Sequence, residues 1–128
     1  MYGNADQLFE YYSDSSAITC KAGAAVTGKR FVKLAAGSTA QLPIVVPCGA
    51  GERPYGVAAW TVANGEHVTV VRRGVVSVTA GAALTVPLAV ASDATGRAVA
   101  VGASPAVAYG DLHGDAAINT DAAVALSF

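Results

Sequence analysis

Three residues near the end of the chain have the types and spacing of a small metal or acid–base site. Asp111, His113 and Asp115 alternate with other residues, so an extended strand would project all three from one face. Two carboxylates and an imidazole suit a divalent ion. However, Gly110 and Gly114 interrupt the cluster, and Asp and His are ordinary turn residues. We therefore interpret the cluster as a turn and expect no metal and no cofactor.

Other candidates for catalysis are weaker. His67 follows a turn and alternates with apolar residues, which is typical of a half-exposed strand position. The segments 27–29 and 95–97 pair a glycine with a basic residue but lack the spacing of a phosphate-binding loop. The sequence contains no nucleophile elbow and no Cys-x-x-Cys pair. We expect that the protein is not an enzyme.

The two cysteines, Cys20 and Cys48, are too few for a disulfide framework or for a zinc site of their own. Both lie in apolar or turn-like surroundings. The interpretation we favour is two free, buried thiols, with a single intramolecular disulfide as the alternative.

The composition describes a folded chain with few surface charges. Hydrophobic residues make up 53% of the 128 residues and charged residues 13%, against about 25% charged in an average protein. Disordered chains have the opposite balance, so disorder is excluded. A small domain with so few charges is expected to have part of its surface covered by partner subunits.

The charges are unevenly distributed along the chain. All eight Lys and Arg residues lie between Lys21 and Arg97, and three acidic residues lie outside this stretch at each end. The net charge of −1 argues against nucleic acid as a partner. The acidic ends could instead contact the basic middle of a neighbour or of the same chain, although the distribution could also arise by chance.

Short runs of Val, Thr, Ile and aromatic residues between turn residues predict many short strands. The clearest unit is a strand over residues 55–62, an Asn-Gly turn over 63–66, a returning strand over 67–72 and a further strand over 75–79. Trp60 is expected to anchor the core. Further strands are predicted over residues 17–20, 30–34, 42–46, 83–90, 97–101 and 122–128. The predicted fold class is all-β, a compact small β-barrel or β-sandwich of short strands with an extended N-terminal arm.

The apolar stretch 74–91 is long enough to be considered as a membrane span. It contains Ser77, Thr79 and Pro87, and it alternates as strands do. We therefore expect no membrane as a partner, and the N-terminus lacks the pattern of a signal peptide.

Residues 1–16 differ from the rest and are predicted to form an N-terminal arm, followed by a single β-domain over 17–128. Aromatic residues alternate there with acidic and polar ones. The arm could fold over its own core or insert into a neighbouring subunit, because aromatic side chains are typical interface anchors. Its candidate partner-binding residues are Tyr2, Leu8, Phe9, Tyr11 and Tyr12.

Two basic patches complete the candidate binding residues. Lys29, Arg30 and Lys33 form one, and Arg72 and Arg73 form the other. Both are interpreted as solvated strand faces, with the acidic surface of a partner as the functional alternative.

Four sequence segments, in their order and spacing, resemble the small head decoration (capsid cement) proteins of tailed bacteriophages. They are ITCKAGAAVTGKRFV at 18–32, PYGVA at 54–58, GEHVTV at 65–70 and GVVSVTAG at 74–81. ATGRA at 94–98 and the apolar end at 122–128 fit the same pattern, so the resemblance covers the chain from about residue 17. It implies a β-rich homotrimer that binds the major capsid protein on the outer surface of the virion and stabilises the expanded shell. The resemblance also implies that the protein is located in the host cytoplasm during assembly, and it supplies no catalytic residues.

The competing hypotheses are another virion module, such as a tail tube or head fibre, and a carbohydrate-binding β-sandwich. The second needs aromatic side chains aligned on an exposed face. Outside the N-terminal segment the sequence offers only Phe31, Tyr55, Trp60, Tyr109 and Phe128. An enzyme built on the cluster at 111–115 ranks last.

Overall fold

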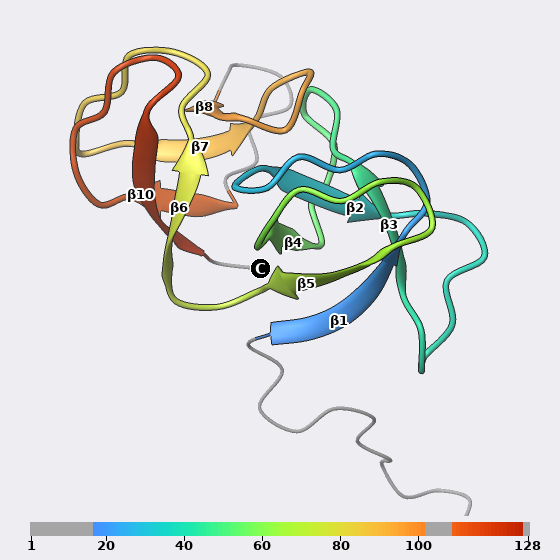
Figure 1. The fold of residues 1–128 in the computed structure, drawn as a ribbon. Coiled ribbons are helices and arrows are strands. Elements are labelled where there is room, and N and C mark those ends of the chain that lie inside the picture. The colour runs from blue at the N-terminus through green and yellow to red at the C-terminus, as the bar shows by residue number, and fades with distance from the viewer. Residues whose placement is uncertain (1–16, 102–108, 127–128) are drawn as a thin grey trace, which may run out of the picture.

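The computed structural model describes residues 17–101 and 109–126, and all of its regular elements are β-strands (Figure 1). Their bounds are β1 Ala17–Ala22, β2 Phe31–Leu34, β3 Ile44–Pro47, β4 Gly56–Ala58, β5 His67–Val71, β6 Val75–Thr79, β7 Ala89–Ser92, β8 Ala98–Ala100, β9 Gly110–Leu112 and β10 Asp121–Leu126. The predicted all-β class is confirmed. The predicted arm, residues 1–16, lies outside the described residues.

The first five strands close into a barrel in the order β1-β3-β2-β4-β5. Side chains alternate between its inside and outside, and β1 shows this directly: Ile18 and Cys20 are buried while Thr19 is exposed. Ile18 pairs with Val70 and Cys20 with Val68 across the antiparallel β1–β5 ladder. The buried members of both strands therefore fill the barrel interior.

The other five strands form a second sheet in the order β6-β10-β9-β7-β8. Its longest ladder joins β6 to β10, where Val78 lies opposite Ala122 and Val76 opposite Val124. Val78, Ala122 and Val124 are buried in one cluster. The sheet thus has one apolar face that needs a covering layer.

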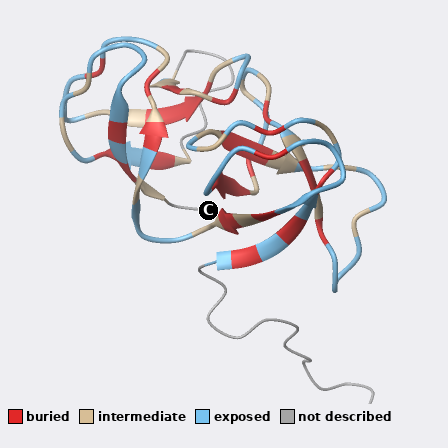
Figure 2. Ribbon diagram, viewed as in Figure 1, coloured by how far each residue is buried: buried red, intermediate tan, exposed pale blue. Residues whose placement is uncertain are grey.

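The barrel supplies that covering layer through strands β2 and β4. Phe31 and Val32 are neighbours on β2 and point to opposite sides, yet both are fully buried. Val32 packs in the barrel interior, whereas Phe31 packs outside it against the cluster of the second sheet. Figure 2 shows buried residues on the strands of both sheets. One apolar core therefore joins the barrel to the second sheet.

Backbone hydrogen bonds cross the same junction. The N–H of Phe31 donates to the carbonyl oxygen of Gly96 at 2.7 Å, and the N–H of Thr79 donates to the carbonyl oxygen of Lys29 at 2.8 Å. A third bond runs from Gly51 to Ser92 at 3.2 Å. These bonds set the position of the second sheet on the barrel.

The prediction for residues 55–62 is only partly right. The turn at Asn64-Gly65 forms as expected, with Gly65 at φ +88°. The preceding strand, however, ends at Ala58, and Trp60 is 50% exposed rather than in the core. Val62, which bridges to Val26, takes a buried position instead. The chain at Trp60 passes so close to Gly28 that a Cβ there would lie 2.8 Å from the Trp60 Cα.

Two further predictions are corrected. Residues 83–88 are not a strand, and β7 begins at Ala89, because Pro87 has no N–H to donate to a ladder. Gly110 does not mark a turn but lies in strand β9, where it pairs with Leu126 of β10. A Cβ at Gly110 would lie 2.8 Å from the Ala125 carbonyl oxygen, so the glycine permits close packing of two strands.

The stretch 74–91 contains β6 and the start of β7, in agreement with the strand interpretation. Residues 17–101 and 109–126 contain no long apolar helix that could span a membrane.

Candidate functional site

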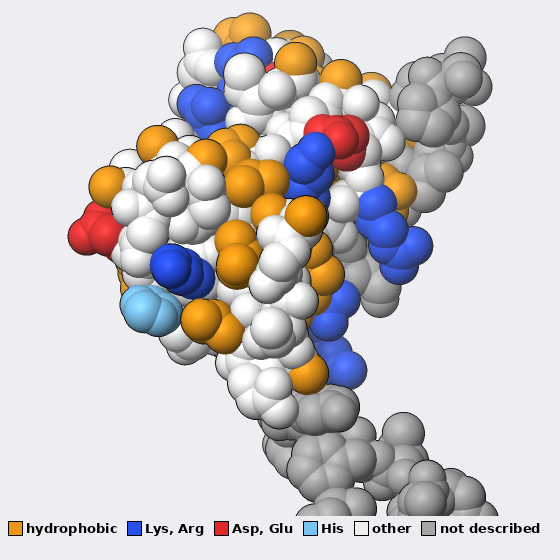
Figure 3. Space-filling model, turned by 90° about the vertical axis from the view of Figure 1, so that its right-hand side faces the viewer, with side chains coloured by type: hydrophobic (Ala, Val, Ile, Leu, Met, Phe, Trp, Pro, Cys, Tyr) orange, Lys and Arg blue, Asp and Glu red, His pale blue; other side chains and the backbone are white. Residues whose placement is uncertain are grey.

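Charge is segregated between the barrel and the second sheet. Residues 17–73 contain seven Lys or Arg and two acidic residues, whereas residues 74–126 contain one Arg and four Asp. Figure 3 views the molecule from the barrel side and shows Lys and Arg side chains around a group of hydrophobic ones. A field of this kind attracts an acidic partner to the barrel.

An open groove of about 390 Å³ lies on the barrel where β5 ends and β4 begins. Basic and aromatic side chains line it, since Lys33, Arg53 and Arg72 surround Tyr55. Arg72 is held in place: its Nε donates to the Tyr55 carbonyl oxygen at 2.8 Å, and its guanidinium lies 4.4 Å from the centre of the Tyr55 ring. Stacked pairs of this kind present a preformed surface to a ligand.

A second hollow of about 320 Å³ shares Tyr55 and Leu34 with the first and is more apolar. Leu34 is 48% exposed and Pro43 forms part of the wall. Ser38 fixes the loop between β2 and β3. Its hydroxyl lies within donating distance of the Ala35 and Ile44 carbonyl oxygens, and it accepts a hydrogen bond from the Ile44 N–H at 2.9 Å. We call the two hollows together the barrel-end groove, lined by Lys33, Leu34, Ser38, Thr39, Ala40, Pro43, Glu52, Arg53, Pro54, Tyr55 and Arg72.

One acidic residue moderates the charge of this groove. Glu52 accepts a hydrogen bond from the Lys33 ammonium, and this bond, followed by one from the Gly49 N–H at 2.7 Å, lowers the Glu52 pKa. Arg53 is exposed and makes no hydrogen bond or ion pair within the described part of the chain. Of the three cations that line the groove, Lys33 is paired with Glu52 and Arg72 is bound to Tyr55, so Arg53 is the one most available to a partner.

The structure divides the basic residues named from the sequence into two groups. Lys33 and Arg72 belong to different patches in the sequence, yet both line the barrel-end groove. Arg73, which follows Arg72 in the sequence, is exposed. Lys29 and Arg30 are instead engaged at the junction with the second sheet. Binding of a partner through all five stays a prediction.

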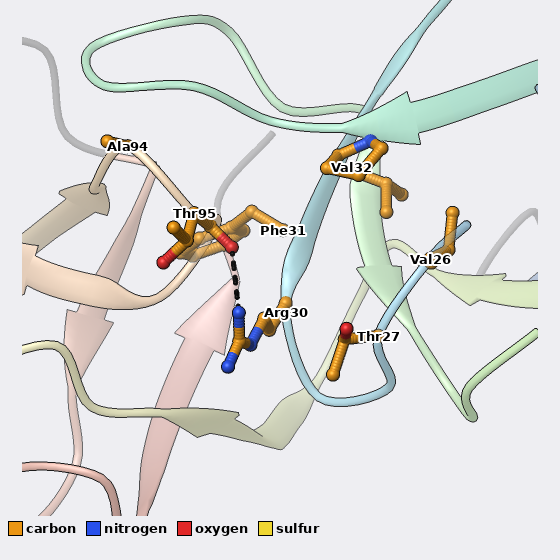
Figure 4. A pocket seen from close by; sticks show the side chains of 8 residues that line it. Val26, Thr27, Arg30, Phe31, Val32, Ala94 and Thr95 are labelled. Atoms are coloured by element: carbon orange, nitrogen blue, oxygen red, sulfur yellow. Dashed lines mark hydrogen bonds between the residues drawn. The ribbon is translucent and has the colours of Figure 1, made fainter. Parts of the chain in front are cut away.

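At the junction, Lys29 pairs with Asp121 of β10 at 3.0 Å. The Arg30 Nη1 donates to the Thr95 carbonyl oxygen at 3.4 Å, as Figure 4 shows. Arg30 and Thr95 line a pocket of about 260 Å³ between barrel and second sheet, and the buried Arg30 Nε has no hydrogen-bond partner. Contacts from the acidic C-terminal part to the basic middle of the same chain therefore exist, which is one of the two arrangements that the charge pattern suggested.

Arg53 was not found from the sequence. It stands alone between Glu52 and Pro54, without the neighbouring base that marked the other patches. The remaining candidates, Tyr2, Leu8, Phe9, Tyr11 and Tyr12, lie outside the described residues.

The cluster at 111–115 gives no sign of a metal site. Asp115 accepts a hydrogen bond from the Val86 N–H at 2.8 Å, and Asp111 lies in β9. Within the part of the chain that the structure describes, no three His, Cys, Asp or Glu side chains group closely enough to hold an ion.

The cysteines are free and buried, as the favoured interpretation expected. Cys20 belongs to the barrel interior and Cys48 to the core shared with the second sheet. Burial raises the Cys20 pKa to about 11, although Arg72 acts in the opposite direction, and burial also raises the Cys48 pKa. Neither thiol is suited to act as a nucleophile.

Comparisons with known proteins point in one direction. The sequence profile of a family described as phage cement protein matches residues 13–127. The fold is similar to that of the crystal structure of the head fiber gp8.5 N base in bacteriophage phi29, with a TM-score of 0.73. That similarity covers 87% of this chain and 92% of the other, at 19% identity. No curated protein matches the sequence.

Proposed function

The chain belongs to the phage cement protein family, and we propose that it stabilises the expanded head by bridging neighbouring major capsid proteins. It is a structural protein of the virion, located at the capsid surface. The family match over residues 13–127 is the observation that supports the bridging role most strongly, because it spans both the barrel and the second sheet. The role requires binding surfaces and no catalytic group.

The barrel-end groove suits such a role. A cement protein adds binding free energy across the joints between shell subunits, so the assembled state is favoured by mass action. We propose that the groove contacts protein segments that combine acidic and apolar side chains, with Arg53 as the main charged contact. Major capsid protein and further copies of this chain are the proposed partners, without nucleic acid or membrane.

We further propose that the protein acts as a homotrimer, with residues 1–16 as an arm and residues 17–128 as the body. Several copies around one axis turn weak contacts into tight overall binding. A closed cyclic oligomer would also cover part of a surface that carries few charges.

A binding experiment tests the proposal. Expanded heads that lack this protein are mixed with the purified chain and sedimented, and we expect saturable binding. Arg53→Glu should weaken binding several-fold, whereas Lys21→Glu should not, although it makes the same charge change. Lys21 is exposed on β1 and does not line the groove. Absence of binding to expanded heads would contradict the proposal.

The similarity to a head-fibre base favours a second candidate, a virion module that anchors a fibre. Imaging of labelled copies on the particle separates the two roles. A cement protein should occupy equivalent joints across the shell, whereas a fibre base should occupy isolated attachment points.

The carbohydrate-binding alternative gains no support from the described aromatic residues. Phe31 is buried in the shared core, and Tyr55 lies against Arg72. Trp60 is exposed, but among the described residues it does not form part of the row of aromatic rings that a sugar-binding face requires.

A further inference from the structure

We propose that the barrel-end groove receives the N-terminal segment, residues 1–16, of a neighbouring copy. This inference rests on the proposed oligomer and adds which two surfaces meet in it. Each copy would donate one segment and accept one, so the contact is head-to-tail and closes into a ring.

The N-terminal segment joins the barrel next to the groove. Ala17, the first residue of β1, lies opposite Val71, the last residue of β5. The next residue, Arg72, lines the groove. Neighbouring strands are about 4.8 Å apart, so the segment leaves the barrel at the same end at which the groove opens.

The length of the segment allows it to reach a neighbouring copy. A stretch of 16 residues spans up to about 50 Å when extended. A domain of this size has a radius of gyration of about 13 Å. The segment is therefore long enough to reach the same end of an adjacent copy in a small ring.

The segment and the groove are chemically complementary. The segment carries Asp6, Glu10 and Asp14 and no Lys or Arg, and its aromatic residues alternate with these acids. The groove presents Arg53 and Arg72 in its basic hollow, and Leu34 lines both this hollow and the more apolar one. Surface ion pairs are individually weak, so the aromatic contacts must supply most of the affinity and the charges the orientation.

The order of side chains supports the same arrangement. Leu8-Phe9-Glu10-Tyr11-Tyr12 places an acid between one apolar pair, Leu8-Phe9, and one aromatic pair, Tyr11-Tyr12. In the groove Tyr55, whose ring stacks on Arg72, lines both the basic and the more apolar hollow. A ring of the segment can thus pack on Leu34 and Tyr55 while Glu10 pairs with a groove arginine.

Crosslinking between two differently tagged chains tests the proposal. One chain carries Tyr11→Cys, the other Leu34→Cys, and both are co-expressed. We expect a disulfide between the two chains on mild oxidation. The native thiols are buried and do not compete. The matched control replaces Leu34→Cys with Ile118→Cys, which is 54% exposed and lies outside the groove.

No disulfide between chains, or an equal yield with the Ile118→Cys control, overturns the proposal. A disulfide that forms only when both cysteines are in one chain also overturns it, because the segment then occupies its own groove. Deletion of residues 1–14 gives a second readout. The β-body should keep its circular dichroism spectrum, and self-association should weaken at least about tenfold, which corresponds to about 1.4 kcal/mol.

Binding to expanded heads is measured on the same preparations. Retained head binding without the disulfide overturns this inference and leaves the proposed function standing. Loss of head binding in a chain that still crosslinks contradicts the proposed function and supports this inference.

Discussion

The backbones of Phe31 and Gly96 lie so close together that no side chain fits between them. The Phe31 N–H donates to the Gly96 carbonyl oxygen at 2.7 Å, and a Cβ on Gly96 would lie 2.6 Å from the Phe31 carbonyl oxygen. Gly96 also has φ +84°, in the left-handed region. The contact joins β2 of the barrel to the loop before β8.

Replacing this glycine should therefore damage the junction. We expect Gly96→Ala to lower the free energy of unfolding by about 2–3 kcal/mol, from backbone strain and the forced separation from Phe31. Gly65→Ala is the matched control, because Gly65 has φ +88° and open space around its Cβ position. Urea unfolding of both variants measures the difference; equal losses would show that the close approach contributes nothing.

Phe31 itself should be the most costly side chain of β2 to remove. Phe31→Ala should lower the free energy of unfolding by about 3–5 kcal/mol, because it leaves a cavity in the core shared by barrel and sheet. Leu34→Ala on the same strand should cost less than about 1 kcal/mol, since Leu34 is 48% exposed. Trp60 fluorescence and circular dichroism should report one transition for the wild type. Two separate transitions would contradict a common core.

Asp93 should make stability depend on acid pH. Burial acts to raise its pKa, but hydrogen bonds from the Arg97 N–H, from the Thr95 N–H and hydroxyl, and from the Arg97 guanidinium outweigh it, and the Asp93 pKa is lowered. A lowered pKa stabilises the fold above the unfolded value of about 3.9 and loses that effect as the pH falls through the folded value.

We therefore expect Asp93→Asn to lower the free energy of unfolding at pH 7 by about 1–3 kcal/mol. The gap from the wild type should shrink below about pH 4. Asp111→Asn, at an exposed position on β9, serves as the control. Thermal unfolding over the pH range measures both, and a gap that stays constant into acid would contradict this role of Asp93.

The thiols should be inert in the folded protein. Cys20 and Cys48 are buried and belong to separate clusters, and the Cys20 pKa is about 11. A thiol reagent at pH 8 should label neither until denaturant is added, and then both. Rapid labelling of the native protein, or a mass 2 Da below that of the reduced chain, would contradict this assignment.

The sequence predicted local features well. Asn64-Gly65 forms the expected turn, and Val68 and Val70 share the buried face of β5 as alternation requires. It did not predict which strands are covered on both sides, because neighbouring residues such as Phe31 and Val32 then break the simple alternation. Trp60 was misplaced for a related reason, since a large apolar side chain was assumed to be in the core while a smaller residue, Val62, is buried there.

The groove could be predicted only in part. Lys33 and Arg72 are candidates from the sequence, but Arg53 is not, and nothing in the sequence indicates that these three positions meet. They come together because β2, β4 and β5 are adjacent in the closed barrel, and barrel closure depends on pairings between distant segments. The parallel β1–β3 pair, which completes the ring, has no local signal in the sequence.

The temperature at which DNA-filled heads release their genome tests the central claim most directly. Heads made without this protein are compared with the same heads after addition of the purified chain. A cement protein adds binding free energy only while the shell is intact, so decorated heads should release DNA at a clearly higher temperature. Release at the same temperature, with the sites on the shell occupied, would contradict a stabilising role.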